Sequence, residues 1–256
     1  MSSIHFFEKG FGQPLVLIHG YCETSKMWTE FSESLSSDFR VICPDLPGCG
    51  GSHIQGEQIT LEEVAVMLEE WMEEHQIEKP IVIGHSLGGY VTLALMELMG
   101  NKLQAAGLFH STALADDQEK KETRNRTITF IKKNGVEKFV TSFVPPLFPE
   151  NRREELAAEI ERAIEYAKRC TLEGLVALAG AMRDRKDRTE VLKTFAGPKL
   201  MIAGTDDGAV KIESSRSLKP LFSRYVELEG VGHMGMVEEK EKTLEIVREF
   251  ALSSQA

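Results

Sequence analysis

The 256-residue chain has few cysteines and no long hydrophobic run, and both absences limit what it can be. No stretch approaches the roughly 18–20 consecutive apolar residues of a membrane-spanning helix, and residues 1–10 lack the apolar segment of a signal peptide. The four cysteines, at positions 22, 43, 49 and 170, match no zinc-ligand spacing and form no C-x-x-C pair. We therefore expect a cytoplasmic protein with reduced, mostly buried thiols and with neither metal nor cofactor.

Positive charge is also scarce. The 30 Lys and Arg residues stand against 40 Asp and Glu, which gives a formal net charge of −10 at pH 7. Because affinity for nucleic acid comes largely from clustered Lys and Arg, this balance argues against a nucleic-acid partner. The sequence instead predicts a small-molecule substrate and no membrane span, and it leaves open whether the protein is a monomer or a homodimer.

Short apolar runs alternate with longer helical patterns along most of the chain. Runs that suit strands buried on both faces occur at 15–19, 40–44, 81–83, 105–109, 199–203 and 225–228. Helical spacing of apolar residues occurs at 61–75, 86–99 and 239–250, and Thr60 with Glu63 fits a capping box at the start of the first of these. The alternation predicts an α/β fold with a mostly parallel central sheet flanked by helices.

One region lacks strand runs. Four amphipathic helical patterns follow one another at 121–134, 136–142, 152–170 and 172–183. We expect residues 116–194 to form a helical cap or lid inserted between two strands. The core would then consist of residues 1–115 and 195–256.

Residues 84–89 read Gly-His-Ser-Leu-Gly-Gly, between a strand pattern and a helix pattern. In this context a G-x-S-x-G motif acts as a nucleophile elbow, where a sharp turn presents Ser86 at the sheet edge and the helix N-terminus favours developing negative charge. A plain glycine-rich turn with a capping serine is the competing interpretation. A dinucleotide site is disfavoured because Ser86 stands where G-x-G-x-x-G requires glycine.

A nucleophilic serine needs a base, and the base needs an orienting acid. His233 is the favoured base because it lies in a glycine-containing loop after the last strand pattern, whereas His110, at the end of a strand, is a lesser candidate. Asp207, three residues past Gly204, is favoured as the acid, with the adjacent Asp206 as its alternative. A third option is the pair at 116–117. The order serine, aspartate, histidine is the order of an α/β-hydrolase triad.

With these landmarks the sequence resembles the α/β-hydrolase superfamily, in particular its small cofactor-free esterase-like members. The resemblance is carried by His-Gly-Tyr at 19–21 with Trp28 following, by 45–52 (Asp-Leu-Pro-Gly-Cys-Gly-Gly-Ser), by the elbow, and by 204–207 with 232–233. It implies an oxyanion hole made by the backbone N–H groups of Tyr21 and Leu87, and a structural turn role for Asp45. The short N-terminus leaves open whether the first strand of the eight-stranded sheet is present.

The function that follows is hydrolysis of a carboxylic ester through an acyl-serine. Carbon–carbon bond, thioester or lactone hydrolysis and cofactor-free perhydrolysis on the same triad remain open, and a ligand-binding member with little turnover is a further alternative. Apolar residues of the cap region favour a small-to-medium apolar acyl group: Phe130, Ile131, Phe139, Phe143, Val144, Leu147, Phe148 and Met182. No arginine cluster stands near the motifs, so the sequence makes no case for a phosphorylated or CoA-linked substrate.

Overall fold

The computed structural model describes residues 4–255, and its strands form one sheet of seven, mostly parallel. The order across the sheet is β1-β3-β2-β4-β5-β6-β7, and β1 alone runs antiparallel to its neighbour. The strands are β1 (Phe6–Lys9), β2 (Pro14–Ile18), β3 (Arg40–Pro44), β4 (Ile81–His85), β5 (Ala105–Phe109), β6 (Lys199–Gly204) and β7 (Arg224–Leu228).

All six predicted strands are confirmed. The sequence interpretation missed β1, because this edge strand has four residues, mostly half-buried, and no continuous apolar run. The five buried residues of β4 and of β5 explain why those central strands were readable. The carboxyl ends of parallel strands lie at one edge of a sheet, so the segments that follow β4, β5 and β6 meet there.

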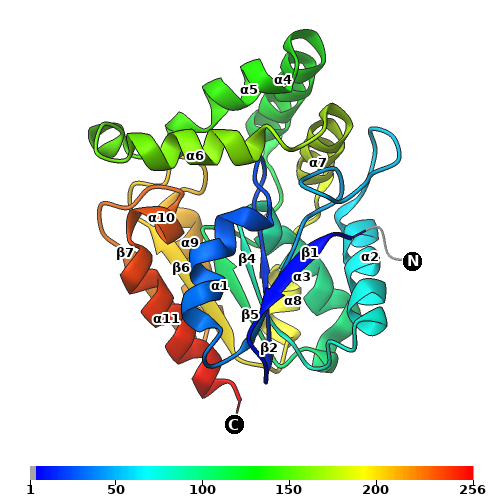
Figure 1. The fold of residues 1–256 in the computed structure, drawn as a ribbon, viewed down its shortest axis with the longest axis vertical. Helices are drawn as coiled ribbons and strands as arrows, with labels where there is room; N and C mark the ends of the chain where they lie inside the picture. Colours follow the sequence, from blue (N-terminus) through cyan, green and yellow to red (C-terminus); the bar gives the residue numbers. More distant parts are fainter. Residues whose placement is uncertain (1–3, 256) are drawn as a thin grey trace.

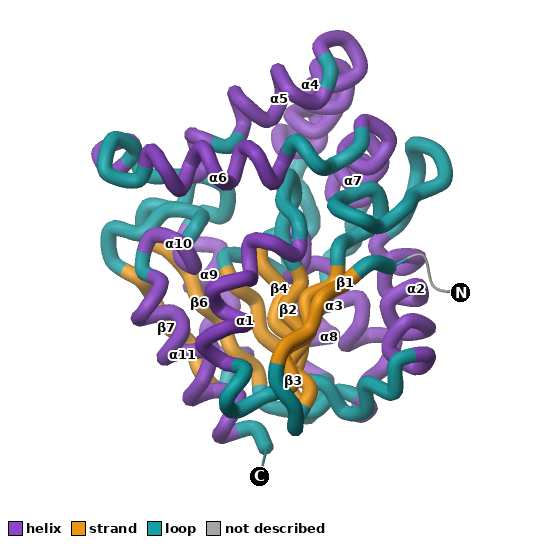
Figure 2. The backbone as a smooth tube through the Cα atoms, in the orientation of Figure 1, coloured by secondary structure: helices purple, strands orange, loops and turns teal. Residues whose placement is uncertain are grey.

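Helices cover both faces of the sheet (Figures 1 and 2). On one side lie α1 (Thr29–Leu35) and α11 (Lys240–Ser253), and on the other lie α2 (Leu61–Glu74), α3 (Leu87–Met99) and α8 (Thr189–Thr194). Two short helices, α9 (Ile212–Leu218) and α10 (Gly235–Glu238), complete this part of the chain.

The predicted capping box of α2 is confirmed. Thr60 Oγ1 accepts a hydrogen bond from the Glu63 backbone N–H at 3.1 Å, and the Glu63 carboxylate accepts from the Thr60 N–H at 2.7 Å. Two of the N–H groups left unpaired at a helix start are therefore satisfied locally, which fixes where α2 begins.

Four helices between β5 and β6 lie over the carboxyl edge of the sheet (Figure 1). They are α4 (Gln118–Asn134), α5 (Val136–Phe143), α6 (Ala157–Ala167) and α7 (Leu172–Asp184). The predicted helix at 152–170 is wrong at its start, since residues 150–156 form a 3₁₀ turn and further turns. There Arg153 Nε donates to the Phe148 carbonyl at 3.1 Å, so a side-chain hydrogen bond helps to hold a non-helical backbone.

The four cysteines are free and buried, as predicted. Within residues 4–255, no helix combines the length and the apolar character that crossing a membrane would require.

Candidate active site

Ser86 occupies a strained turn between β4 and α3. Its backbone has φ 49° and ψ −113°, a combination that side-chain-bearing residues rarely adopt. The turn is held by hydrogen bonds on both sides, because the Ser86 N–H donates to the Phe109 carbonyl at 2.9 Å and Ser111 Oγ donates to the Ser86 carbonyl at 2.7 Å. The serine is thus fixed at the first turn of α3, as the elbow motif predicts.

The glycines of the elbow allow this turn to pack. A Cβ on Gly84 would overlap the carbonyl of Gly88, and a Cβ on Gly88 would overlap the carbonyl of Ile18 on the neighbouring strand. A Cβ on Gly89 would overlap the Ser111 side chain. Each glycine therefore permits a close backbone approach that no larger residue allows.

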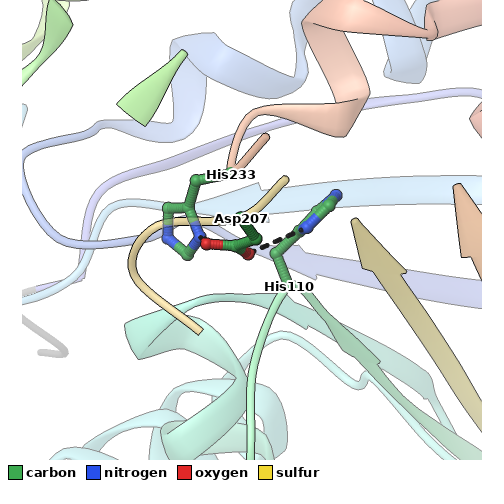
Figure 3. Close-up of side chains that lie close together, drawn as sticks. All are labelled: His110, Asp207 and His233. Atoms are coloured by element: carbon green, nitrogen blue, oxygen red, sulfur yellow. Dashed lines mark hydrogen bonds and ion pairs between the residues drawn. The ribbon is translucent and has the colours of Figure 1, made fainter. Parts of the chain in front are cut away.

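Asp207 follows β6 and carries a carboxylate between two imidazoles (Figure 3). His233 Nδ1 lies 2.8 Å from Asp207 Oδ2, and His110 Nδ1 lies 3.2 Å from the same oxygen. The backbone N–H groups of Ala209 and Val210 donate to Oδ1 at 2.8 and 2.9 Å. Burial alone would raise the pKa of Asp207, but the two histidines lower it well below its ordinary value.

The other acid candidates lie elsewhere. Asp206 is exposed and accepts a hydrogen bond from Thr205 Oγ1 at 3.0 Å. Asp117 caps α4 through the Lys120 N–H at 2.8 Å, and Asp116 is buried against two arginines. Of the four aspartates weighed from the sequence, only Asp207 contacts His233 in the described part of the chain.

The loop that carries His233 is held at several points. The His233 N–H donates to the Leu147 carbonyl at 2.9 Å, and the His233 carbonyl accepts from His85 Nε2 at 2.9 Å. The carboxylate of Glu238 accepts from the N–H groups of Gly232 and Met234 at 2.8 and 3.0 Å. These contacts fix the loop over the strand ends, so that His233 and Ser86 line the same pocket.

A buried ion pair behind the elbow was not predicted. Glu23 and His85 contact at 2.9 Å, and the Glu23 carboxylate also accepts from the Gly20 N–H at 2.7 Å. Burial would raise the pKa of Glu23, yet His85 and the Gly20 N–H hold it below its ordinary value. Burial would likewise lower the pKa of His85, and Glu23 raises it instead. The pair therefore ties the 19–21 loop to the elbow and to the His233 loop.

Of the two predicted oxyanion-hole residues, Tyr21 lines the same pocket as Ser86, and Leu87 follows Ser86 in the chain. Leu87 is the first residue of α3, and the Tyr21 hydroxyl donates to the Leu175 carbonyl of α7 at 2.8 Å. In residues 4–255, the backbone N–H groups of Tyr21 and Leu87 donate to no other protein group. Asp45 accepts hydrogen bonds from the N–H groups of Ser25 and Gly51, which fits its predicted turn role.

The pocket above Ser86 has a cavity volume of about 280 Å³. Of the apolar cap-region residues picked out from the sequence, Phe143, Leu147 and Met182 line it, and the remaining five pack inside the protein or against its core. Lys120, Arg124 and Lys211 line it as well. The sequence interpretation missed these cations, because it looked for basic residues beside the motifs and not on the helices folded over them.

His110 does not lie at this pocket. Among residues 4–255 its Nε2, which is buried beside Gly235, has no hydrogen-bond partner, while its Nδ1 bonds Asp207. The trio of His110, Asp207 and His233 is also the one group in the described chain whose ligand atoms, within 4.8 Å of one another, could hold a metal ion. The hydrogen bonds of Asp207 to the two histidines account for this grouping without a metal ion. The absence of a metal and of a cofactor stays a prediction.

We expect the His110→Asn variant to show a weaker loss of stability on acidification. Burial lowers the pKa of His110 to about 4, while the unfolded chain titrates near 6.5. The folded state thus binds fewer protons, and the wild-type protein loses stability as pH falls from about 7 towards 4, on the order of 2 kcal/mol between pH 7 and 5. Asparagine suits this position because it tolerates the backbone φ of 48° at residue 110, and its side-chain amide keeps an N–H donor for Asp207.

Urea unfolding of both proteins at pH 7 and pH 5 measures this difference. The fall in the free energy of unfolding should be smaller in the variant by that amount. An identical fall in both proteins would show that His110 is not the group responsible.

Comparisons with known proteins agree with the fold. The model of the alpha/beta hydrolase family matches residues 15–246. Among solved structures, the chain is similar to a thermophilic esterase from Thermogutta terrifontis, determined with malate bound, with 27% sequence identity and a TM-score of 0.93. That similarity covers 99% of this chain and 94% of the esterase.

Two curated relatives are similar over part of their length. The dihydrolipoyllysine-residue acetyltransferase component of the acetoin cleaving system of Pseudomonas putida is 26% identical over 242 residues, which are 93% of this chain and 64% of that protein. The pimeloyl-[acyl-carrier protein] methyl ester esterase of Vibrio cholerae is 39% identical over 89 residues, which are 35% of this chain and 33% of that protein. The chain thus covers less than two thirds of the length of both.

Proposed function

This chain belongs to the alpha/beta hydrolase family, and from that premise we propose that it hydrolyses carboxylic esters through an acyl-serine intermediate. The observation that carries the proposal is the pairing of a strained Ser86 with a buried His233 in one pocket, His233 being hydrogen-bonded to Asp207. Esterases among the similar proteins support the same reaction class. The triad is therefore Ser86 as nucleophile, His233 as base and Asp207 as orienting acid.

The reaction starts when His233 Nε2 removes the proton of Ser86 Oγ as that oxygen attacks the ester carbonyl. Asp207 holds the Nδ1–H of His233, which keeps Nε2 free to accept a proton and stabilises the imidazolium that forms. The N–H groups of Tyr21 and Leu87 stabilise the tetrahedral oxyanion. His233 then protonates the leaving alcohol, and a water molecule, deprotonated by His233, releases the acid from Ser86.

Residues 116–194 act as the cap in this proposal. Contacts that join this segment to the catalytic loops support the assignment, namely the hydrogen bond from the Tyr21 hydroxyl to Leu175 and that from the His233 N–H to Leu147. The last helix of this segment, α8, packs on α3 of the core and connects the cap to β6. The core then comprises residues 1–115 and 195–256.

The pocket favours a small substrate. Its volume of about 280 Å³ lies just below the range of ligand sites, roughly 300–1,000 Å³. The apolar side chains of Phe143, Leu147 and Met182 provide the surface for a short apolar segment of the acyl group.

Labelling with a fluorophosphonate probe and hydrolysis of p-nitrophenyl esters test this function. We expect the probe to modify Ser86, as identified by mass spectrometry, and turnover to be highest with acyl chains of about two to four carbons, given the small pocket. Pre-treatment with the probe should abolish turnover. A protein that neither reacts with the probe nor hydrolyses any ester from C2 to C12 would contradict the proposal.

A further inference from the structure

The helix α4 brings two cations to the pocket of Ser86. Lys120 and Arg124 are four residues apart, so they lie on the same face of the helix, and both line the cavity. Both side chains are partly buried. In the described chain, the Lys120 ammonium forms no hydrogen bond or ion pair with a protein group.

The positive charge at this end of the pocket exceeds the negative charge beside it. Asp116, whose side chain is 0% exposed, pairs with Arg124 at 3.2 Å and with Arg185 at 2.7 Å. Burial lowers the pKa of Lys120, and the nearby Arg185 and Arg124 lower it further, whereas Asp116 and Asp117 raise it. Asp116 thus faces three cations, the two arginines that pair with it and Lys120, in a chain whose formal net charge is −10.

The remaining charged residues of the pocket lie at its exposed rim. Asp117 is engaged in capping α4, and Glu119 and Lys211 are exposed. Water screens these rim charges more strongly than it screens the partly buried cations of α4. The charges at the rim therefore do not cancel the excess of positive charge that α4 brings to the pocket.

The guanidinium of Arg185 is locked in place beneath the pocket. It stacks over the ring of Tyr90 at 4.1 Å, and it donates to the Leu114 and Met182 carbonyls at 3.1 and 2.8 Å. Tyr90 lines the cavity together with Ser86. With Arg185 held against Asp116, Lys120 and Arg124 are the partly buried cations that line the cavity, and Lys211 lines it from the exposed rim.

We propose that the substrate carries a carboxylate besides its ester, and that Lys120 and Arg124 bind this carboxylate while Ser86 attacks the ester carbonyl. The substrate class is then a half-ester of a short dicarboxylic acid, whose apolar carbons contact the apolar wall of the cavity. This inference depends on the proposed esterase function and narrows its substrate. A charged hydrogen bond supplies the discrimination, because a neutral isostere leaves the partly buried ammonium of Lys120 without a charged partner.

Hydrolysis of two matched esters, followed by pH-stat, tests this specificity. Ethyl hydrogen glutarate carries the carboxylate, and ethyl 4-carbamoylbutanoate replaces it with a neutral amide of the same shape. We expect kcat/KM to favour the acid by about 10–100-fold, the range of a hydrogen bond to a charged group. The Lys120→Met and Arg124→Gln variants should each reduce this preference about tenfold.

The same helix offers matched controls. Lys133 and Arg126 are exposed on α4 and do not line this pocket, so Lys133→Met and Arg126→Gln should keep the preference of the wild type. A preference near one in the wild-type protein, or one that Lys120→Met and Arg124→Gln leave unchanged, overturns the inference.

Calorimetric titration of glutarate into the Ser86→Ala protein separates this inference from the esterase proposal. Binding needs no turnover, and we expect it to weaken about tenfold when Lys120→Met is added. If the protein neither reacts with the fluorophosphonate probe nor hydrolyses any of the esters, the esterase proposal fails and the titration decides the carboxylate site. Absence of glutarate binding in that case overturns the site as well.

Discussion

Replacing Ser86 with alanine should reduce kcat for ester hydrolysis by about 10⁴–10⁶-fold, the loss expected when the nucleophile of a triad is removed. The substitution deletes one oxygen that, in residues 4–255, forms no hydrogen bond with another protein group. The turn itself is held by backbone contacts and by Ser111, which alanine does not change. Initial rates with a short p-nitrophenyl ester, measured on both proteins, test the expectation.

The Ser86→Gly variant supplies the control for folding. The backbone at this residue has φ 49°, which costs a residue with a side chain on the order of 1–3 kcal/mol and glycine very little. We therefore expect this variant to be as inactive as Ser86→Ala and to require more urea for unfolding than the wild type. Activity within tenfold of the wild type in either variant would remove Ser86 from the role of nucleophile.

The sequence was most informative where local spacing decides the structure. The elbow could be predicted because the motif around Ser86 lies between a buried strand and an apolar helix, and both are short-range patterns. Asp207 and His233 could be predicted because each follows a strand of a parallel sheet, so their loops reach one edge. The contact of His110 with Asp207 was not predicted. It depends on β5 and β6 being neighbours in the sheet, and the spacing of apolar residues along the chain does not show the order of the strands.

The charged part of the pocket could not be predicted in this way. Lys120 and Arg124 lie 34 and 38 residues beyond Ser86, and they reach it only because α4 folds over the sheet and packs on α7. The spacing of residues within one helix does not show which of its faces will line a pocket formed by other helices and strands. The same holds for the pair of Glu23 and His85, which joins a loop to a strand 62 residues away.

Replacing Asp207 with asparagine should lower kcat on the order of 10⁴-fold, by changing which nitrogen of His233 carries the proton. The carboxylate accepts from four groups: two backbone N–H groups at Oδ1, His110 at Oδ2, and His233, which is closest to Oδ2 at 2.8 Å and lies 3.0 Å from Oδ1. Asparagine offers one carbonyl and one amide group. If the carbonyl keeps the backbone donors, the amide N–H₂ faces Nδ1 of His233, which must then accept, and the proton moves to Nε2.

A proton on Nε2 blocks the step on which the reaction depends, since that nitrogen must accept the proton of Ser86. Asp206→Asn is the matched control, because the Asp206 carboxylate is exposed and, in the described part of the chain, is hydrogen-bonded only to Thr205. It should keep kcat within about twofold of the wild type, as surface substitutions usually have small effects. An equal loss of kcat in the two variants would show that Asp207 acts only through the negative charge that it adds to the loop after β6. A large loss confined to Asp207→Asn identifies the hydrogen bond to His233 as the element that sets the active tautomer.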